Sequence, residues 1–156
     1  MQAPTFRVHS AANFTARMTG LATSVTKGVP MIHVPDVARA LDWYASIGFK
    51  ELNRFDDDGE VNFGMVAFGG AELMLNMHGK PAPHDVSLWF YTDQVNALYE
   101  TLKSRRIEAA QAELAGDSGT QPSGIEFEQD IEDMFYGARQ FCIRDLNGYH
   151  LYFIGG

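Results

Sequence analysis

Residues 34–44 of this chain read Val-Pro-Asp-Val-Ala-Arg-Ala-Leu-Asp-Trp-Tyr, and this stretch decides the fold. Asp36 is a good helix N-cap, because its carboxylate can accept the free backbone N–H groups of a first helical turn. Apolar residues then recur at helical spacing as far as Tyr44, and Gly48 supplies a helix stop. Together with the apolar run that precedes the aspartate, the stretch predicts a strand over 29–34 followed by a helix.

The rest of the first half reads as three strands, and the second half repeats the whole order. The three strands are expected at 49–55, 61–68 and 71–77, separated by an Asp-Asp-Asp-Gly turn and a Gly-Gly turn. After a linker with two prolines, a strand, an aspartate cap and a helix follow again, 57 residues later. The elements expected in the second half are a linker at 78–85, a strand at 86–92, a helix over 95–102, a strand beginning at 107–110, a surface loop at 111–124, and strands at 125–131, 139–143 and 149–154. The chain is therefore predicted to contain two copies of one βαβββ module, at 29–77 and 86–154.

The overall composition restricts the function. The chain has 156 residues, of which 46% are hydrophobic and 21% charged, as expected for a globular domain with its own core. Its net charge of −8 argues against nucleic-acid binding and against adhesion to anionic membranes. No apolar run approaches the roughly 18 residues that cross a bilayer. The one cysteine, Cys142, excludes an internal disulfide and favours a reducing compartment, so we expect a cytoplasmic protein in which this thiol is buried and unreactive.

Residues 1–28 differ from the rest of the chain in charge. They contain three basic residues and no acidic residue, whereas the remaining 128 residues contain nine basic and twenty acidic residues. The segment lacks the continuous apolar core of a secretory signal, although its basic, acid-free and Thr-rich composition resembles a transit peptide. A flexible arm, an expression-related extension or a packing tail is the preferred interpretation. We therefore expect an N-terminal extension at 1–28 and a single domain at 29–156.

The stretch 34–44, followed by Ile-Gly-Phe at 47–49, resembles the opening of the vicinal-oxygen-chelate superfamily, which contains glyoxalases, extradiol dioxygenases, fosfomycin-resistance enzymes and bleomycin-resistance proteins. The residues at 136–141 and 143–149 are similar to its closing strand-turn-strand, with Leu146 where the family usually has proline. The resemblance implies an α+β fold in which two tandem βαβββ modules form a curved mixed sheet with a central cleft, and it implies a homodimer. It does not identify the reaction, because the fold hosts unrelated chemistries.

In the metal enzymes of this superfamily, four ligands point into the cleft from the first and fourth strands of both modules, and they are His, Glu or Gln. Carried over from the quoted stretches, these positions are Val29, Asn76, Ser87 and Tyr152 in this sequence. Valine has no donor atom, and the other three are weak ligands for zinc, nickel, manganese or iron. A two-residue shift in register would offer Glu72 and His150, which are too few for a stable site. Neither a metal nor another cofactor is therefore expected.

Alternation along the strands predicts which side chains face the cleft. Aromatic walls, thioethers and hydrogen-bonding groups suit a flat organic ligand, because apolar area provides affinity and a few polar groups fix orientation. The residues expected to bind the ligand are His33, Met74, Asn76, Ser87, Trp89, Tyr91, His150 and Tyr152, with Met31 beside them. Each also has a purely structural interpretation: thioethers fill core gaps, Trp89 can anchor the sheet or a dimer seam, and the histidines can be exposed strand ends.

Two classes of function remain open from the sequence. The preferred hypothesis is metal-independent binding of a small organic, cationic aromatic molecule, similar to antibiotic sequestration by bleomycin-resistance proteins, because the acidic body and the aromatic cleft agree with it. The alternative is an enzyme: either a glyoxalase-type lyase or isomerase or a dioxygenase with a metal, or a metal-free enzyme with His33 or His150 as general base. The expected partners are thus a small molecule and a second copy of the chain, without nucleic acid or membrane.

Overall fold

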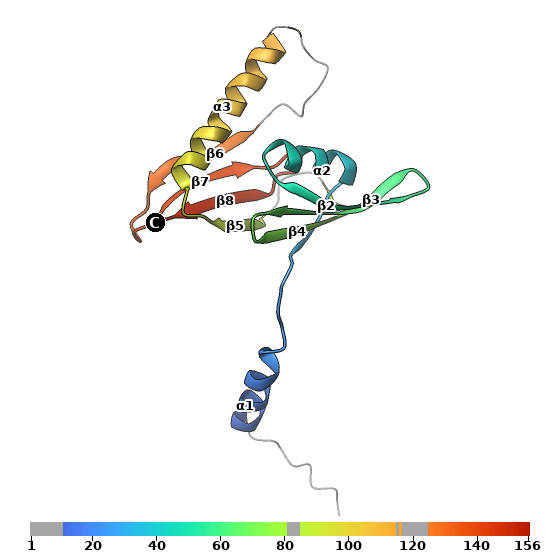
Figure 1. Ribbon diagram of the computed structural model, residues 1–156, viewed down its shortest axis with the longest axis vertical. Helices are drawn as coiled ribbons and strands as arrows, with labels where there is room; N and C mark the ends of the chain where they lie inside the picture. The colour runs from blue at the N-terminus through green and yellow to red at the C-terminus, as the bar shows by residue number, and fades with distance from the viewer. Residues whose placement is uncertain (1–10, 81–84, 115, 117–124) are drawn as a thin grey trace, which may run out of the picture.

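The two modules that the sequence predicts are both present. The structure, a computed structural model, describes residues 11–80, 85–114, 116 and 125–156. An N-terminal helix comes first along the chain. The two modules follow, and each consists of a strand, a helix and three strands (Figure 1). The elements are α1 (Ala11–Ala22), β1 (Met31–His33), α2 (Val37–Ser46), β2 (Lys50–Asp57), β3 (Glu60–Phe68), β4 (Ala71–Asn76), β5 (Ser87–Tyr91), α3 (Val95–Leu114), β6 (Glu126–Asp133), β7 (Arg139–Arg144) and β8 (His150–Gly155). The predicted α+β fold of two βαβββ modules is confirmed.

Each module forms a four-stranded mixed sheet, and the strand order is the same in both. Module one has the order β1-β4-β3-β2, and module two has the order β5-β8-β7-β6. In both sheets the first strand runs parallel to the fourth, while the other neighbours are antiparallel. Within the described residues, β1 and β5 are therefore edge strands that hydrogen-bond to one neighbour in their own sheet.

Helix α2 begins at the residue that the sequence predicts. The Asp36 carboxylate accepts the backbone N–H of Arg39 at 2.9 Å, which satisfies one of the free donors of the first turn. The helix packs closely on β3 because residue 64 is a glycine: a Cβ there would lie 2.7 Å from both Cδ atoms of Leu41. Gly48 follows the helix with a φ of +104°, a left-handed conformation that favours glycine.

Helix α3 is longer than the sequence analysis predicts, and one predicted strand is wrong. The predicted helix ends near Leu102 and a strand begins at 107–110, whereas the helix in the structure continues to Leu114. The apolar stripe does end at Leu102, which is 3% exposed, while Ile107 is 56% exposed. The later turns are helical because Lys, Arg, Glu, Gln and Ala are strong helix formers that need no buried face.

Two predicted loops fall partly outside the described residues. The loop expected at 111–124 is wrong for its first four residues, which belong to α3, and 117–124 are not among the described residues. The linker expected at 78–85 includes 81–84, which are not described either.

Helices α2 and α3 cover one side of the two sheets and leave the other side uncovered (Figure 1). Exposure alternates accordingly along the strands: in β4, Leu73 and Leu75 are at most 1% exposed, whereas Met74 between them is half-buried. The same holds in β8 for buried Leu151 and half-buried Tyr152. We call the uncovered side the open face. Among its residues on β1, β4, β5 and β8 are Met31, His33, Met74, Asn76, Ser87, Trp89, Tyr91, His150 and Tyr152.

The two modules share one core and are joined by hydrogen bonds. A single cluster of buried apolar side chains contains residues of both modules. The hydroxyl of Tyr44 in α2 donates to the Asp145 carboxylate of module two at 2.7 Å. In the other direction, the hydroxyl of Tyr149 donates to the backbone carbonyl of His33 at 2.7 Å. These contacts fix the two sheets relative to each other.

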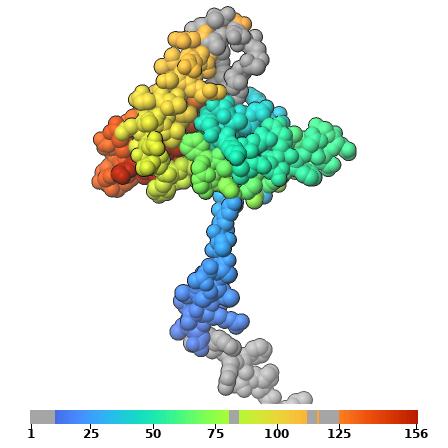
Figure 2. Space-filling model, in the orientation of Figure 1, coloured from blue at the N-terminus to red at the C-terminus, as the bar shows by residue number. Residues whose placement is uncertain are grey.

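Helix α1 stands apart from the two modules. None of its residues is buried, and an extended segment connects it to β1, so that it extends from the body as a stalk in Figure 2. Lys27 of the connecting segment forms an ion pair with Glu72 of β4. Of the helices that the structure describes, none has both the length and the apolar character needed to cross a membrane.

Candidate functional site

In module one, the predicted ligand-binding residues form two cross-strand pairs on the open face. Met31 pairs with Met74, and His33 pairs with Asn76, between β1 and β4. Met31 is 45% exposed. The His33 ring atom Nδ1 lies 3.1 Å from the Met77 carbonyl oxygen, and Asn76 Oδ1 accepts the Met77 backbone N–H at 3.0 Å. Both polar side chains are thus held by the end of β4.

In module two, the predicted residues form an aromatic row. Ser87 pairs with His150 and Trp89 with Tyr152, and Tyr91 follows on the same side of β5. The Trp89 and Tyr152 rings are stacked, with centroids 4.3 Å apart and an interplanar angle of 6°. Tyr152 therefore covers one face of the indole. Because β5 is an edge strand in the described part of the chain, no described strand of this sheet lies beside the other face, and Trp89 is 45% exposed. A half-exposed indole on a rigid support offers a surface to a flat apolar ligand.

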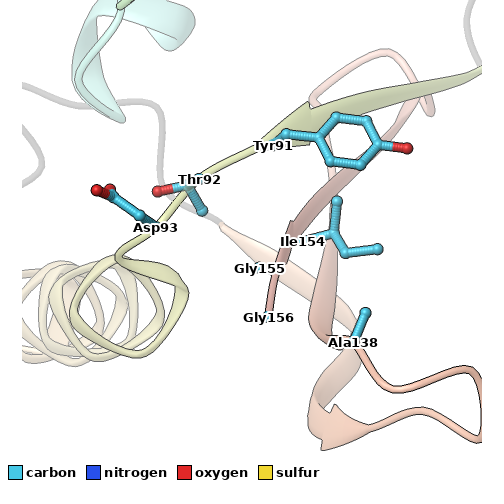
Figure 3. A pocket seen from close by; sticks show the side chains of 7 residues that line it. All are labelled: Tyr91, Thr92, Asp93, Ala138, Ile154, Gly155 and Gly156. Atoms are coloured by element: carbon cyan, nitrogen blue, oxygen red, sulfur yellow. The ribbon is translucent and has the colours of Figure 1, made fainter.

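A pocket of about 470 Å³ lies at the end of this aromatic row. Its lining residues are Tyr91, Thr92, Asp93, Ala138, Ile154, Gly155 and Gly156. Figure 3 shows the Tyr91 ring and the Ile154 side chain on the same side of the strands, whereas Thr92 and Asp93 point the other way. Since Tyr91 pairs with Ile154 two residues beyond the stacked pair, the pocket continues the aromatic row towards the C-terminus.

On the other side of Tyr152, strands β6 and β7 bring charged groups to the open face. Glu128 Oε2 contacts His150 Nδ1 and accepts a hydrogen bond from Cys142 Sγ at 3.5 Å. Glu128 Oε1 accepts a hydrogen bond from Arg144 Nη2 at 2.8 Å. Burial alone would raise the pKa of the Glu128 carboxyl, but the hydrogen bonds from His150 and Arg144 outweigh it and hold the pKa below its ordinary value. The carboxylate is therefore ionised at neutral pH.

Cys142 is buried, as the sequence analysis predicts. Its pKa is raised to about 12, first by burial and then by the neighbouring Glu128 carboxylate. The thiol is protonated at neutral pH in the metal-free chain, and a protonated thiol is not a nucleophile. The raised pKa therefore gives no support for a nucleophilic role of this thiol.

The sequence analysis missed Glu128, Cys142 and Arg144 as residues of the open face. In β7, Cys142 and Arg144 alternate with the core residues Phe141 and Ile143, so the alternation rule could have placed both. In β6, Glu128 follows Phe127, which packs against the core, so the same rule points Glu128 to the open face. The register shift after Phe127 is not visible in the order of residue types, because it is set by backbone pairing.

The four positions at which metal enzymes of the superfamily hold their ligands do not suit a metal ion in this chain. Val29 has no donor atom, and the Asn76 side-chain oxygen already accepts the Met77 N–H at 3.0 Å. Ser87 offers a neutral hydroxyl. Burial raises the pKa of the Tyr152 phenol, which is therefore also neutral. Zinc, nickel, manganese and iron require imidazole, carboxylate or thiolate donors, so no metal-dependent step follows from these positions.

Comparison with known proteins agrees with this architecture. The sequence model of the Glyoxalase/Bleomycin resistance protein/Dioxygenase superfamily matches residues 28–153. No curated protein matches the chain. Among solved structures, the fold is similar to that of TioX from Micromonospora sp. ML1, with a TM-score of 0.62 and 22% identity over 84% of this chain and 98% of TioX.

Two further solved structures share the fold. A bleomycin-binding protein complexed with bleomycin gives a TM-score of 0.61 and 18% identity over 85% of this chain and 99% of that protein. A glyoxalase-related enzyme from Clostridium phytofermentans gives a TM-score of 0.62 and 19% identity over 85% of this chain and 95% of the enzyme. With a family match over residues 28–153 and two βαβββ modules in the structure, the chain belongs to the Glyoxalase/Bleomycin resistance protein/Dioxygenase superfamily.

Proposed function

We propose that this protein binds a small, flat, cationic organic molecule on the open face and that this binding requires no metal ion. The observation that carries the proposal is the Trp89–Tyr152 stack, with centroids 4.3 Å apart, at an edge strand where the indole remains 45% exposed. Burying such a ring against a ligand gains apolar area, and an offset or edge-to-face arrangement adds about 0.5–1.5 kcal/mol beyond the area alone. The bleomycin-binding protein of the same fold supports a binding role for this one.

The other groups of the open face explain why the ligand should be both flat and polar at its edges. In module one, Met31 and Met74 provide flexible thioethers that adapt to an irregular outline. Ser87 and His150 provide hydrogen-bonding groups two residues before the stacked rings along β5 and β8. A largely apolar surface with a few placed polar groups is typical of small-molecule sites.

Two features favour a cationic ligand. Outside residues 1–28, the chain contains twenty acidic and only nine basic residues, so a positively charged molecule is attracted to the body. The face of an indole also attracts cations, with an energy of about 0.5–2 kcal/mol that depends on how far the site is desolvated. We further propose, as the sequence analysis expects, that the protein works as a homodimer in the cytoplasm.

Calorimetric titration with a chelator present tests the proposal. The panel contains bleomycin, other cationic aromatic compounds and uncharged analogues of matched shape. We expect binding of at least one cationic compound, weaker binding of its uncharged analogue, and loss of more than about 2 kcal/mol of binding free energy in Trp89→Ala, as for an aromatic anchor at a binding hot spot.

Phe14→Ala is the matched control, because Phe14 is an aromatic residue that is 65% exposed on the separate helix α1. This variant should bind like the unaltered chain. The proposal would be contradicted if no compound of the panel binds, or if Trp89→Ala binds the compounds as tightly as the unaltered chain.

A further inference from the structure

A bulge in β6 puts two residues, Glu128 and Gln129, opposite one residue of β7. Phe127 pairs with Ile143, but the next pair along the two strands joins Gln129 to Cys142. Glu128 and Gln129 therefore both lie opposite Cys142. Bulges of this kind re-aim a side chain and occur next to functional sites. The Glu128 carboxylate contacts side chains of the two neighbouring strands, β7 and β8.

Three different metal-binding groups meet beside this bulge. Glu128, Cys142 and His150 each offer one ligand atom, and these three atoms lie within 4.8 Å of one another. Zinc bonds of about 2.3 Å to sulfur and about 2.0–2.2 Å to nitrogen and oxygen fit within a triangle of this size. The side chains of Glu128 and His150 are 30% and 21% exposed and Cys142 is buried behind them, so an ion can enter from the open face.

The charges around the cluster suit a divalent ion. We propose that Glu128, Cys142 and His150 bind one transition-metal ion of the zinc class, with water at the fourth position. The thiol proton leaves to solvent, and one thiolate and one carboxylate then balance the two positive charges of the ion. Thiolate and imidazole donors select such ions over magnesium or calcium, which prefer oxygen.

Arg144 completes the arrangement as a positioning residue. Its Nη2 donates to Glu128 Oε1 at 2.8 Å, while the other carboxylate oxygen, Oε2, is the one beside His150 and Cys142. Hydrogen bonding of the outer oxygen orients a carboxylate ligand, and loss of such outer partners costs about 10–100-fold in metal affinity. The arginine thus supports the site without occupying the oxygen that faces the ion.

This site differs from the one that the superfamily's metal enzymes use. Its ligands come from β6, β7 and β8 of one module, whereas the four positions discussed above lie just before β1, at Val29, and on β4, β5 and β8. The two proposals share His150 but are tested separately, because the ligand titrations are performed with a chelator present. Failure of metal binding therefore leaves the small-molecule proposal intact, and the reverse also holds.

Cobalt titration of the full chain, after removal of bound metal by a chelator, tests the proposal. We expect one cobalt ion per chain, with visible bands of tetrahedral intensity and a near-ultraviolet thiolate-to-cobalt charge-transfer band. One equivalent of zinc should displace the cobalt. Cys142→Ser should abolish the charge-transfer band, and Glu128→Gln and His150→Gln should each weaken cobalt binding by more than about tenfold, the lower limit for loss of an outer partner.

Two matched controls separate the site from general surface binding. Glu126→Gln removes an exposed carboxylate from the same strand, and His78→Asn removes an exposed histidine outside the cluster. Both variants should bind cobalt like the unaltered chain, and circular dichroism confirms that every variant is folded. The proposal is overturned if the unaltered chain gives no charge-transfer band with excess cobalt, or if the folded Glu128→Gln and His150→Gln variants bind as tightly as the controls.

Discussion

At the scale of single residues, the Tyr44–Asp145 pair joins the two modules through a buried hydrogen bond of 2.7 Å. Asp145 also accepts the backbone N–H groups of Asn147 and Tyr149 at 2.8 and 2.9 Å, so this carboxylate organises the turn before β8 as well. Burial raises the pKa of Asp145, while these hydrogen bonds act in the opposite direction. The contact between helix α2 and the turn before β8 therefore depends on one carboxylate that is 4% exposed.

Tyr44→Phe removes the hydroxyl without changing the ring. We expect the free energy of unfolding in urea to fall by about 1–3 kcal/mol, because a buried acceptor loses its partner. Tyr99→Phe is the control, since the Tyr99 hydroxyl bonds to an exposed carboxylate, that of Asp130, and its loss should cost less. An equal loss for the two variants would contradict the importance of the buried bond.

The Cys142 thiol should be unreactive in the folded, metal-free protein. Its pKa of about 12 results from burial and from Glu128. Because the ordinary value is about 8.5, the folded state keeps the proton more tightly, and the thiol's contribution to stability is lost as pH rises from about 8.5 towards 12. A thiol reagent at pH 8 should modify the chain only in urea. Rapid modification of the folded chain would show that the thiol is accessible.

How far single residues of the site can be predicted depends on the regularity of their strand. His33, Trp89 and Tyr152 lie on the open face because β1, β5 and β8 keep strict alternation, which the sequence displays directly. Alternation after the core-packed Phe127 points Glu128 to the same face, but the bulge that leaves both Glu128 and Gln129 opposite Cys142 could not be predicted. The stacking of Trp89 on Tyr152 also depends on the pairing of β5 with β8, which no local pattern encodes.

At the scale of elements, the two helices illustrate which signals a sequence contains. Helix α2 was predictable from its cap and its buried stripe, both of which are features of residues 36–48. The second half of α3 was not predictable in the same way, because none of the described side chains at 103–111 is buried. There, helix propensity alone decides, and the β-branched Ile107 suggested a strand that does not form.

This difference predicts unequal roles for the two halves of α3. Leu102→Ala, at a side chain that is 3% exposed, should reduce the free energy of unfolding by about 2–5 kcal/mol, as for other buried leucines. Ala110→Pro should break the exposed later turns and lower the helical signal in circular dichroism, since proline disfavours a helix interior. Global stability in urea should change little for Ala110→Pro. A stability loss as large as that of Leu102→Ala would mean that the later turns are part of the core structure.

At the scale of the whole molecule, the open face is the feature that helices α2 and α3 leave uncovered. It exposes large apolar side chains, with Met31 and Trp89 at 45% and Tyr91 at 82%. Clustered exposed apolar residues mark surfaces that bind a ligand or another chain. The internal repeat allowed both modules to be predicted, whereas the pairing of the first strand with the fourth in each sheet required the structure.

We expect the chain to form a homodimer. Light scattering coupled to size-exclusion chromatography should give twice the chain mass of 17.3 kDa at micromolar concentration. Replacing an exposed apolar residue of the open face, as in Met31→Glu, should shift the mass towards that of one chain if this face takes part in the contact. A single-chain mass at every concentration would contradict the dimer.

The central claim is that a ligand stacks against Trp89, and the chain offers a direct way to observe this residue. It has two tryptophans, and Trp43 is 1% exposed in the core. In Trp43→Phe, the fluorescence comes from Trp89 alone. Titration with the tightest-binding cationic aromatic compound should change the Trp89 emission saturably and protect the indole from acrylamide quenching. If calorimetry shows binding while the emission and the quenching of Trp89 stay unchanged, the ligand binds elsewhere and the account is wrong.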